Sequence, residues 1–189
     1  MRFALGHDLG RVDKFEWPLF AGDFHETACQ DTTTLRTLAA RGSMVPMRLN
    51  SITANRHIFD GQVNGKPLRL LLNFDGGRAL RLQVAGDGEQ MIADDGPLDA
   101  PFSMDEHGQM DIADVTGSLF PTLQGLEVAQ VETLESDGKR VGVKLSVARG
   151  QPFHIWVDGD ELHWGDGAAL SSHDWLHGAV PTPSERIKV

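Results

Sequence analysis

Two runs of alternating residues meet at a tight turn in residues 126–147, LEVAQVETLESDGKRVGVKLSV. In the second run, apolar residues such as Val143 and Leu145 alternate with polar ones, which is the period-two pattern of a half-buried strand. The turn is Asp137-Gly138, and Asp-Gly is typical of type I′ hairpin turns, because both central residues take a positive φ. This stretch therefore predicts an antiparallel hairpin.

The same pattern of short strands and glycine-containing turns occurs on both sides of this hairpin. Asn64-Gly65 predicts a second hairpin turn, between strands at 56–63 and 67–74. Tight turns of this kind connect antiparallel strands, whereas parallel strands need long crossover connections. Further strands are predicted at 79–85, 89–93, 153–157 and 161–164.

The two hairpins belong to a longer internal similarity. A shift of 73 residues superimposes 64–91 on 137–164 without gaps, and the apolar positions keep the same phase. One explanation is a duplicated meander of four strands. The other is that any two meanders with Gly-Asp turns look alike, because turn geometry selects the same residues. Both explanations stay open at this point.

We therefore expect a mainly β fold, an antiparallel sandwich or barrel built from two four-stranded meanders, with one short N-terminal helix. The helix is predicted at 32–41, where Asp31 or Thr32 can cap its start and Gly42 can end it. After Gly178 we expect an extended coil, because Pro181 and Pro183 disfavour regular structure. We expect a single domain over 1–189, with these parts: a helical and aromatic segment packed on the sheet (1–42), the first meander (43–93), a crossover (94–125), the second meander (126–167), and a short turn and tail (168–189).

The charge of the chain restricts its partners. The formal net charge is −10, from 27 acidic and 17 basic residues, so nucleic acid and anionic membrane surfaces are disfavoured as partners. A basic protein partner or a cationic ligand fits this charge. The single cysteine, Cys29, cannot form an intrachain disulfide. No apolar run approaches the roughly 20 residues of a spanning helix, and no signal peptide is visible, so we expect a soluble, cytoplasmic protein.

The first functional hypothesis is a protein without enzymatic activity that binds a protein partner. A small acidic β-domain can capture a basic partner by electrostatic steering, as an immunity protein neutralising a basic toxin domain would. The predicted binding residues lie in and beside the acidic turns near the end of the second meander: Asp158, Asp160, Glu161, Trp164 and Asp166.

The second hypothesis is a metal-dependent hydrolase that uses a histidine-rich region near the C-terminus. A helical turn at 173–177, capped by Ser171 or Ser172, would place His173 and His177 four residues apart, a spacing that can bind one zinc or other divalent ion. His163 and Asp174 complete the predicted ligand set, and no other cofactor is expected.

The third hypothesis is a small-ligand site inside a β-barrel. Its cavity would be lined by aromatic side chains of the second meander, namely Phe153, Trp156 and Trp164.

Overall fold

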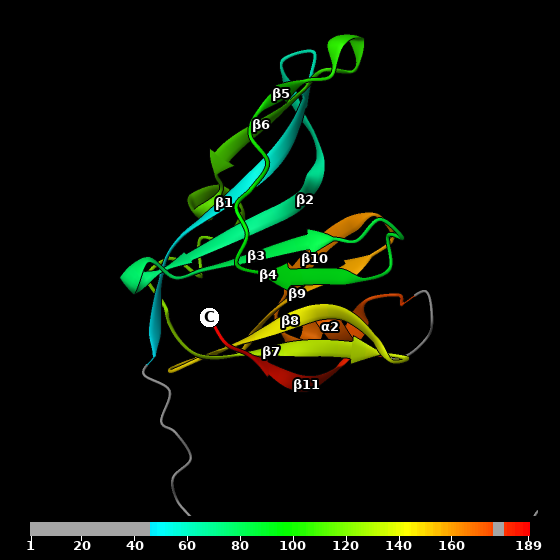
Figure 1. The fold of residues 1–189 in the computed structure, drawn as a ribbon. Coiled ribbons are helices and arrows are strands. Elements are labelled where there is room, and N and C mark those ends of the chain that lie inside the picture. Colours follow the sequence, from blue (N-terminus) through cyan, green and yellow to red (C-terminus); the bar gives the residue numbers. More distant parts are fainter. Residues whose placement is uncertain (1–45, 176–179) are drawn as a thin grey trace, which may run out of the picture. The chain divides into compact units, whose positions relative to one another are not determined.

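The computed structural model describes residues 46–175 and 180–189, and Figure 1 shows their fold. The described chain is mainly antiparallel β, which confirms the predicted fold class. All of its elements belong to one compact unit, residues 42–189. The strands are β1 (Met47–Phe59), β2 (Gln62–Phe74), β3 (Ala79–Val84), β4 (Met91–Asp94), β5 (Phe102–Ser103), β6 (Gln109–Asp114), β7 (Glu127–Ser136), β8 (Lys139–Val147), β9 (Phe153–Asp158), β10 (Glu161–Gly165) and β11 (Thr182–Ile187).

The helical elements of the described chain are short. They are the α-helices α1 (Thr116–Leu119) and α2 (Gly167–Ser172), and the 3₁₀ turns η1 (Asp75–Gly77) and η2 (Asp105–His107). None of the helices in 46–175 or 180–189 has the length and apolar character that crossing a membrane requires. The predicted helix at 32–41, with the rest of the segment 1–42, lies outside the described residues.

Two meanders of four strands form the main path of the sheet, in the order β10-β9-β8-β7-β1-β2-β3-β4. They meet where Met47 and Arg48 of β1 pair with Val128 and Glu127 of β7. The path of hydrogen-bonded strands ends at β10 and β4, so the sheet is not closed into a barrel. β6 pairs with β1, and β11 pairs with β7, beside this path.

The hairpin between β7 and β8 is the one predicted from the sequence. Ser136 pairs with Lys139, and the intervening Asp137 and Gly138 have φ values of 51° and 74°. Both angles are positive, as a type I′ turn requires.

The predicted hairpin turn at Asn64-Gly65 is wrong, because the chain turns four residues earlier. Phe59 pairs with Gln62 across Asp60-Gly61, whose φ values are 49° and 72°. Asp-Gly forms this turn as readily as Asn-Gly does, so local preference does not choose between the two. Asn64 instead pairs with His57 inside the β1–β2 ladder.

Gly65 begins an irregular stretch of β2. Asn55 pairs with Arg69 and His57 pairs with Asn64, so residues 65–68 lie opposite the single residue Arg56. Gly65 has a φ of 72°, a left-handed conformation that glycine adopts without strain. The extra residues form a bulge, and bulges redirect side chains locally.

One core joins the two meanders. Leu70 and Leu82 of the first meander and Val143 and Ile155 of the second are each fully buried in it. The 73-residue shift places Leu70 of β2 on Val143 of β8, and Leu82 of β3 on Ile155 of β9. The residues that the shift superimposes are therefore buried in both meanders. The duplication itself stays a prediction.

The segment predicted as a crossover carries β5, η2, β6 and α1. It is fixed to β1 through buried Thr116, whose Oγ1 accepts a hydrogen bond from the backbone N–H of Ile52 at 2.7 Å. Beyond α1, Phe120 is 1% exposed within the core. Figure 1 shows β5 and β6 lying with the adjoining parts of β1 and β2, beyond the ends of β3 and β4.

The C-terminal tail is a strand, so the predicted coil after Gly178 is wrong. In β11, Thr182 pairs with Glu135 and Pro183 with Leu134. Proline is tolerated in an edge strand such as this one, because one side of the strand needs no N–H donor. Buried Thr133 secures the strand by accepting a hydrogen bond from the Glu185 N–H at 3.0 Å.

Candidate functional site

Three of the predicted acidic binding residues are engaged in contacts within the chain. The Asp158 carboxylate lies 2.6 Å from Nε2 of His173. Glu161 forms an ion pair with Lys66 at 3.2 Å. Asp166 caps α2, where its Oδ1 accepts a hydrogen bond from the Ala169 N–H at 2.9 Å. These carboxylates hold the β9–β10 hairpin, the β2 bulge and α2 in place.

The other two predicted binding residues line pockets. Asp160 is exposed in the β9–β10 turn and borders a pocket of about 570 Å³. Trp164 is partly buried, with its ring centroid 4.8 Å from that of Phe120. It lines two smaller pockets.

The predicted metal ligands come together in part. The rings of His163 and His173 are 4.6 Å apart between centroids, and Asp174 lines the same pocket as both. His177 lies outside the described residues. Within 46–175 and 180–189, no three His, Cys, Asp or Glu side chains are arranged to hold a metal ion. The four-residue site therefore stays a prediction.

The predicted helical turn at 173–177 is wrong for its described residues, because α2 ends at Ser172 and residues 173–175 are not helical. The helix begins earlier, since Asp166 supplies its N-cap. His173 instead packs edge-on against two indoles, 5.4 Å from Trp156 and 5.0 Å from Trp175 between ring centroids. With its bond to Asp158, this packing fixes the chain after α2 against β9.

Two histidines of this region favour the neutral form. Burial lowers the pKa of His154, and the neighbouring Lys144 ammonium lowers it further. Burial also lowers the pKa of His163, followed by the charges of Lys66 and His173. Lys66 Nζ lies 3.1 Å from Nδ1 of His163, and an ammonium group only donates, so Nδ1 accepts and the ring proton is assigned to Nε2.

These lowered pKa values predict that the protein loses stability as the pH falls from 7 to 5. The unfolded histidines titrate near 6.5, so below that pH the unfolded chain binds more protons than the folded chain does. The contribution of these two neutral histidines to the free energy of unfolding is complete above pH 6.5. It is lost as the pH falls toward their pKa values in the folded protein. The urea midpoint, measured from pH 8 to pH 5, checks this.

The substitution His154→Leu should flatten that pH dependence, because it removes the more deeply buried imidazole. The same substitution at His107, whose side chain is 76% exposed, serves as the control and should leave the slope unchanged. A parent midpoint that stays constant between pH 7 and pH 5 would contradict the lowered pKa values.

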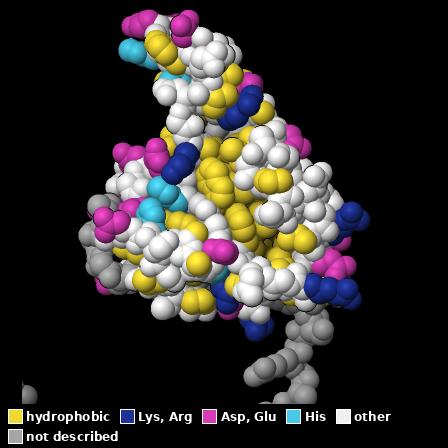
Figure 2. All heavy atoms as spheres, turned by 180° about the vertical axis from the view of Figure 1, so that it is seen from behind, with side chains coloured by type: hydrophobic (Ala, Val, Ile, Leu, Met, Phe, Trp, Pro, Cys, Tyr) yellow, Lys and Arg dark blue, Asp and Glu magenta, His cyan; other side chains and the backbone are white. Residues whose placement is uncertain are grey.

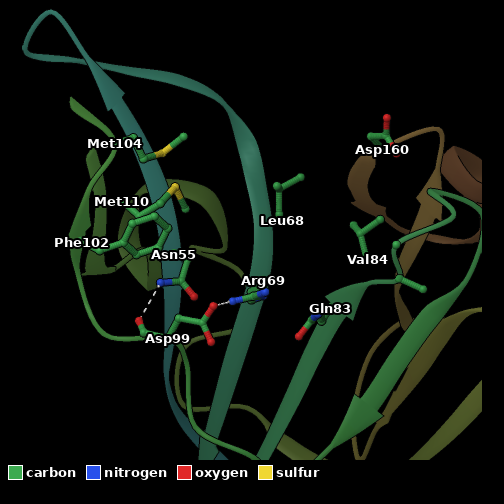
Figure 3. A pocket seen from close by; sticks show the side chains of 12 residues that line it. Asn55, Leu68, Arg69, Gln83, Val84, Asp99, Phe102, Met104, Met110 and Asp160 are labelled. Carbon is green, nitrogen blue, oxygen red and sulfur yellow. Dashed lines mark hydrogen bonds and ion pairs between the residues drawn. The ribbon is translucent and has the colours of Figure 1, made fainter. Parts of the chain in front are cut away.

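A pocket of about 570 Å³ lies beside the β5–β6 hairpin, and Asp160 is the one residue of its lining that the sequence analysis names as a binding residue. Figure 3 shows Phe102, Met104 and Met110 grouped on one side of it, opposite Leu68 and Val84. Leu68 and Phe102 are 46% and 50% exposed, although both are large and apolar. The pocket therefore presents apolar surface to solvent.

The polar wall of this pocket is a row of side chains across the first meander. Asn55, Arg69 and Gln83 are cross-strand neighbours on β1, β2 and β3 and line the pocket together. Ile52 and Ala54 point into the core from β1, so Asn55 lies on the opposite face of the strand. Asn55 is nevertheless only 2% exposed.

Asn55 is buried because the chain after β4 covers it. The Asn55 amide nitrogen donates to the Asp99 carbonyl at 3.1 Å, and the Asp99 carboxylate pairs with Arg69. Arg81 holds this covering segment, since it donates to Asp94 at 2.8 and 2.7 Å and to the Pro97 carbonyl at 2.7 Å. The hydrogen bond from Arg81 lowers the pKa of Asp94.

One atom of this wall lacks a partner. Oδ1 of Asn55 is buried, and no hydrogen-bond donor reaches it from the described part of the chain. A buried amide oxygen without a donor costs about 1–3 kcal/mol. Figure 3 shows the Asn55 amide nitrogen directed at Asp99 and its oxygen directed away from that residue.

The comparisons with known proteins return no relative. No protein-family model, no curated protein and no solved structure matches the chain.

Proposed function

We propose that this chain is a binding protein for a small molecule with an apolar body and an amine or other N–H donor at its head, held in the pocket beside the β5–β6 hairpin. The observation that carries the proposal is the buried Oδ1 of Asn55, an acceptor without a donor in the wall of that pocket. Oδ1 is closed to solvent in this structure, so a ligand N–H would supply the missing hydrogen bond by displacing the side chains that cover it.

The size and lining of the pocket support a small ligand. Its volume of about 570 Å³ falls within the range of about 300–1,000 Å³ that is usual for small-molecule sites. Such sites combine mostly apolar walls with a few polar groups that orient the ligand. Met104 and Met110 supply flexible thioether side chains, which adapt to ligands of different shape.

The charges around the pocket favour a donor or a cation over an anion. Two carboxylates, Asp99 and Asp160, line the pocket, against the single guanidinium of Arg69. Arg69 is already paired with Asp99. The net charge of −10 would also attract a cationic ligand over a distance and repel an anionic one.

A basic protein partner, as an immunity-type function requires, has less support. Asp158, Glu161 and Asp166 of the predicted acidic surface are bound to groups of the same chain. A partner would have to compete with those contacts.

Octylamine tests the proposal by isothermal titration calorimetry on the full chain. The variant Asn55→Leu keeps the branched shape of the side chain and removes the acceptor together with the donor to Asp99. Binding should weaken about fivefold or more, the equivalent of roughly 1 kcal/mol for one hydrogen bond. Asn50→Leu makes the same change on the exposed face of β1 and should leave binding unchanged.

Two outcomes would overturn the proposal. One is the absence of octylamine binding at millimolar concentration. The other is equal affinity for octylamine in the parent and in Asn55→Leu. A ligand-independent check comes from the urea midpoint of Asn55→Leu without octylamine, which separates a folding defect from a lost contact.

A further inference from the structure

The residue after Asn55 faces a second, separate hollow. Successive side chains of a strand point to opposite faces, so Arg56 points away from the pocket that Asn55 lines. Arg56 lines a hollow of about 300 Å³ between the β2 bulge, α1 and β10. Figure 2 shows an apolar hollow on the face seen from behind, with Lys, Arg and His side chains and also Asp and Glu side chains around it.

The floor and walls of this hollow are apolar. They are formed by side chains from three elements that are distant in the sequence: Val63, Pro67, Val115, Leu119 and Trp164. The bulge at 65–68 adds three residues to β2 opposite Arg56, and three of its residues line the hollow: Gly65, Lys66 and Pro67. Lys66 therefore lines the hollow together with Arg56.

Both cations have donors to spare. Arg56 reaches one acceptor among the described residues, Oδ2 of Asp111 at 3.3 Å from Nη2, so other N–H groups of its guanidinium are left over. Its Nε is closed to solvent and does not count among the donors for a ligand. Lys66 Nζ contacts Glu161 at 3.2 Å and His163 at 3.1 Å, so one of its three N–H groups is left over. A guanidinium and an ammonium beside an apolar wall match a carboxylate that carries an alkyl chain.

We propose that this hollow binds a small amphipathic carboxylate, with its head group between Arg56 and Lys66 and its alkyl chain on Trp164, Leu119 and Val115. The site is independent of the amine site proposed above, because the two lie on opposite faces of β1. In a chain of net charge −10, a carboxylate needs cations nearby, and two line this hollow. Each is paired with one carboxylate, Arg56 with Asp111 and Lys66 with Glu161, so the head group would bind the N–H groups that these pairs leave over.

Octanoate is the probe, titrated into the full chain by isothermal titration calorimetry. The variants Arg56→Met and Lys66→Met keep most of the alkyl stem and remove the charge. Each should weaken octanoate binding roughly tenfold, because a charge-assisted hydrogen bond is lost. Arg78→Met is the matched control, since Arg78 also pairs with a single carboxylate, Asp75 at 3.0 Å, but lies outside the hollow.

The head group and the site are tested separately. Octanol should bind at least tenfold more weakly than octanoate, because it carries no charge for Arg56 and Lys66 to pair with. Octylamine binding should weaken in Asn55→Leu and be unchanged in Arg56→Met. The two proposals, the amine site and the carboxylate site, can therefore be contradicted independently of each other.

A measurement on the parent protein tests the site without any variant, so it does not depend on whether the variants fold. Nuclear Overhauser contacts are expected between the octanoate chain and the Trp164 indole. Three results would overturn the proposal: no octanoate binding at millimolar concentration, binding without contacts to Trp164, or equal binding of octanoate by the parent and by folded Arg56→Met and Lys66→Met.

Discussion

Gly142→Ala is expected to lower the free energy of unfolding by about 3 kcal/mol, the upper part of the usual range for overpacking. Gly142 lies in β8, between Leu134 of β7 and Trp156 of β9. A methyl group there would lie 2.5 Å from the Ile155 carbonyl oxygen and 3.0 Å from both Cα and Cβ of Trp156. These are mainly backbone atoms of a paired strand, and they cannot move aside without breaking the β8–β9 ladder.

Urea denaturation of the full chain measures this effect. Gly117→Ala is the matched control: Gly117 is exposed in α1, and an added methyl group there meets nothing within 4 Å. It should change stability by less than about 1 kcal/mol, in the stabilising direction, because alanine favours helix more than glycine does. Equal midpoints for Gly142→Ala and the parent would show that β8 and β9 separate more easily than their packing indicates.

The hairpin between β7 and β8 was predicted correctly from the sequence. In β8, apolar residues alternate with polar ones from Val143 on, and Asp137-Gly138 is the one strong turn signal between β7 and β8. The strands predicted from this alternation and this turn agree with the structure, because β7, β8, β9 and β10 each pair with the next strand in the sequence. The antiparallel fold class follows from such local signals alone.

The first meander offered two turn signals, and the sequence did not choose between them. Asp60-Gly61 and Asn64-Gly65 both allow positive φ, and the chain uses the first as the turn and the second as the start of a bulge. The choice depends on long-range pairing, since β6 joins the other edge of β1 along residues 53–58 and supports a longer β1. Short-range preference does not contain that information.

The tail was missed for a similar reason. Prolines and polar residues predict a coil at Thr182–Ile187, yet the free edge of β7 offers hydrogen-bond partners there. Tertiary pairing overrides local propensity at such edges.

The candidate site was predicted only in part. His163 and His173 do lie together, because the β9–β10 hairpin and α2 fold back on each other locally. The Asn55 pocket was not predictable, since Asp99, which covers Asn55, is 44 residues away in the sequence. The only signal was a polar residue directly after the apolar Ala54 in a strand, and many exposed positions look the same.

Phe120→Ala is expected to cost about 3–5 kcal/mol, the usual range for truncating a buried phenylalanine. Phe120 is 1% exposed, and its ring lies 6.2 Å from that of Phe153 and 4.8 Å from that of Trp164. It joins the segment that follows α1 to the second meander, so its removal leaves a cavity where β9, β10 and the crossover meet.

The measurement is urea denaturation followed by tryptophan fluorescence, because Trp164 reports directly on the cavity beside it. Phe59→Ala makes the same truncation at the β1–β2 turn, where the side chain is 49% exposed, and should cost less than about 1 kcal/mol. A similar cost for both variants would mean that the crossover is not anchored through Phe120.

The two core variants test packing in opposite ways. Gly142→Ala adds a methyl group at a position that is already filled, and Phe120→Ala removes a ring and leaves a cavity. A large loss in both would show that the second meander and the crossover form one tightly packed unit, on which the wall of the hollow beside Arg56 depends.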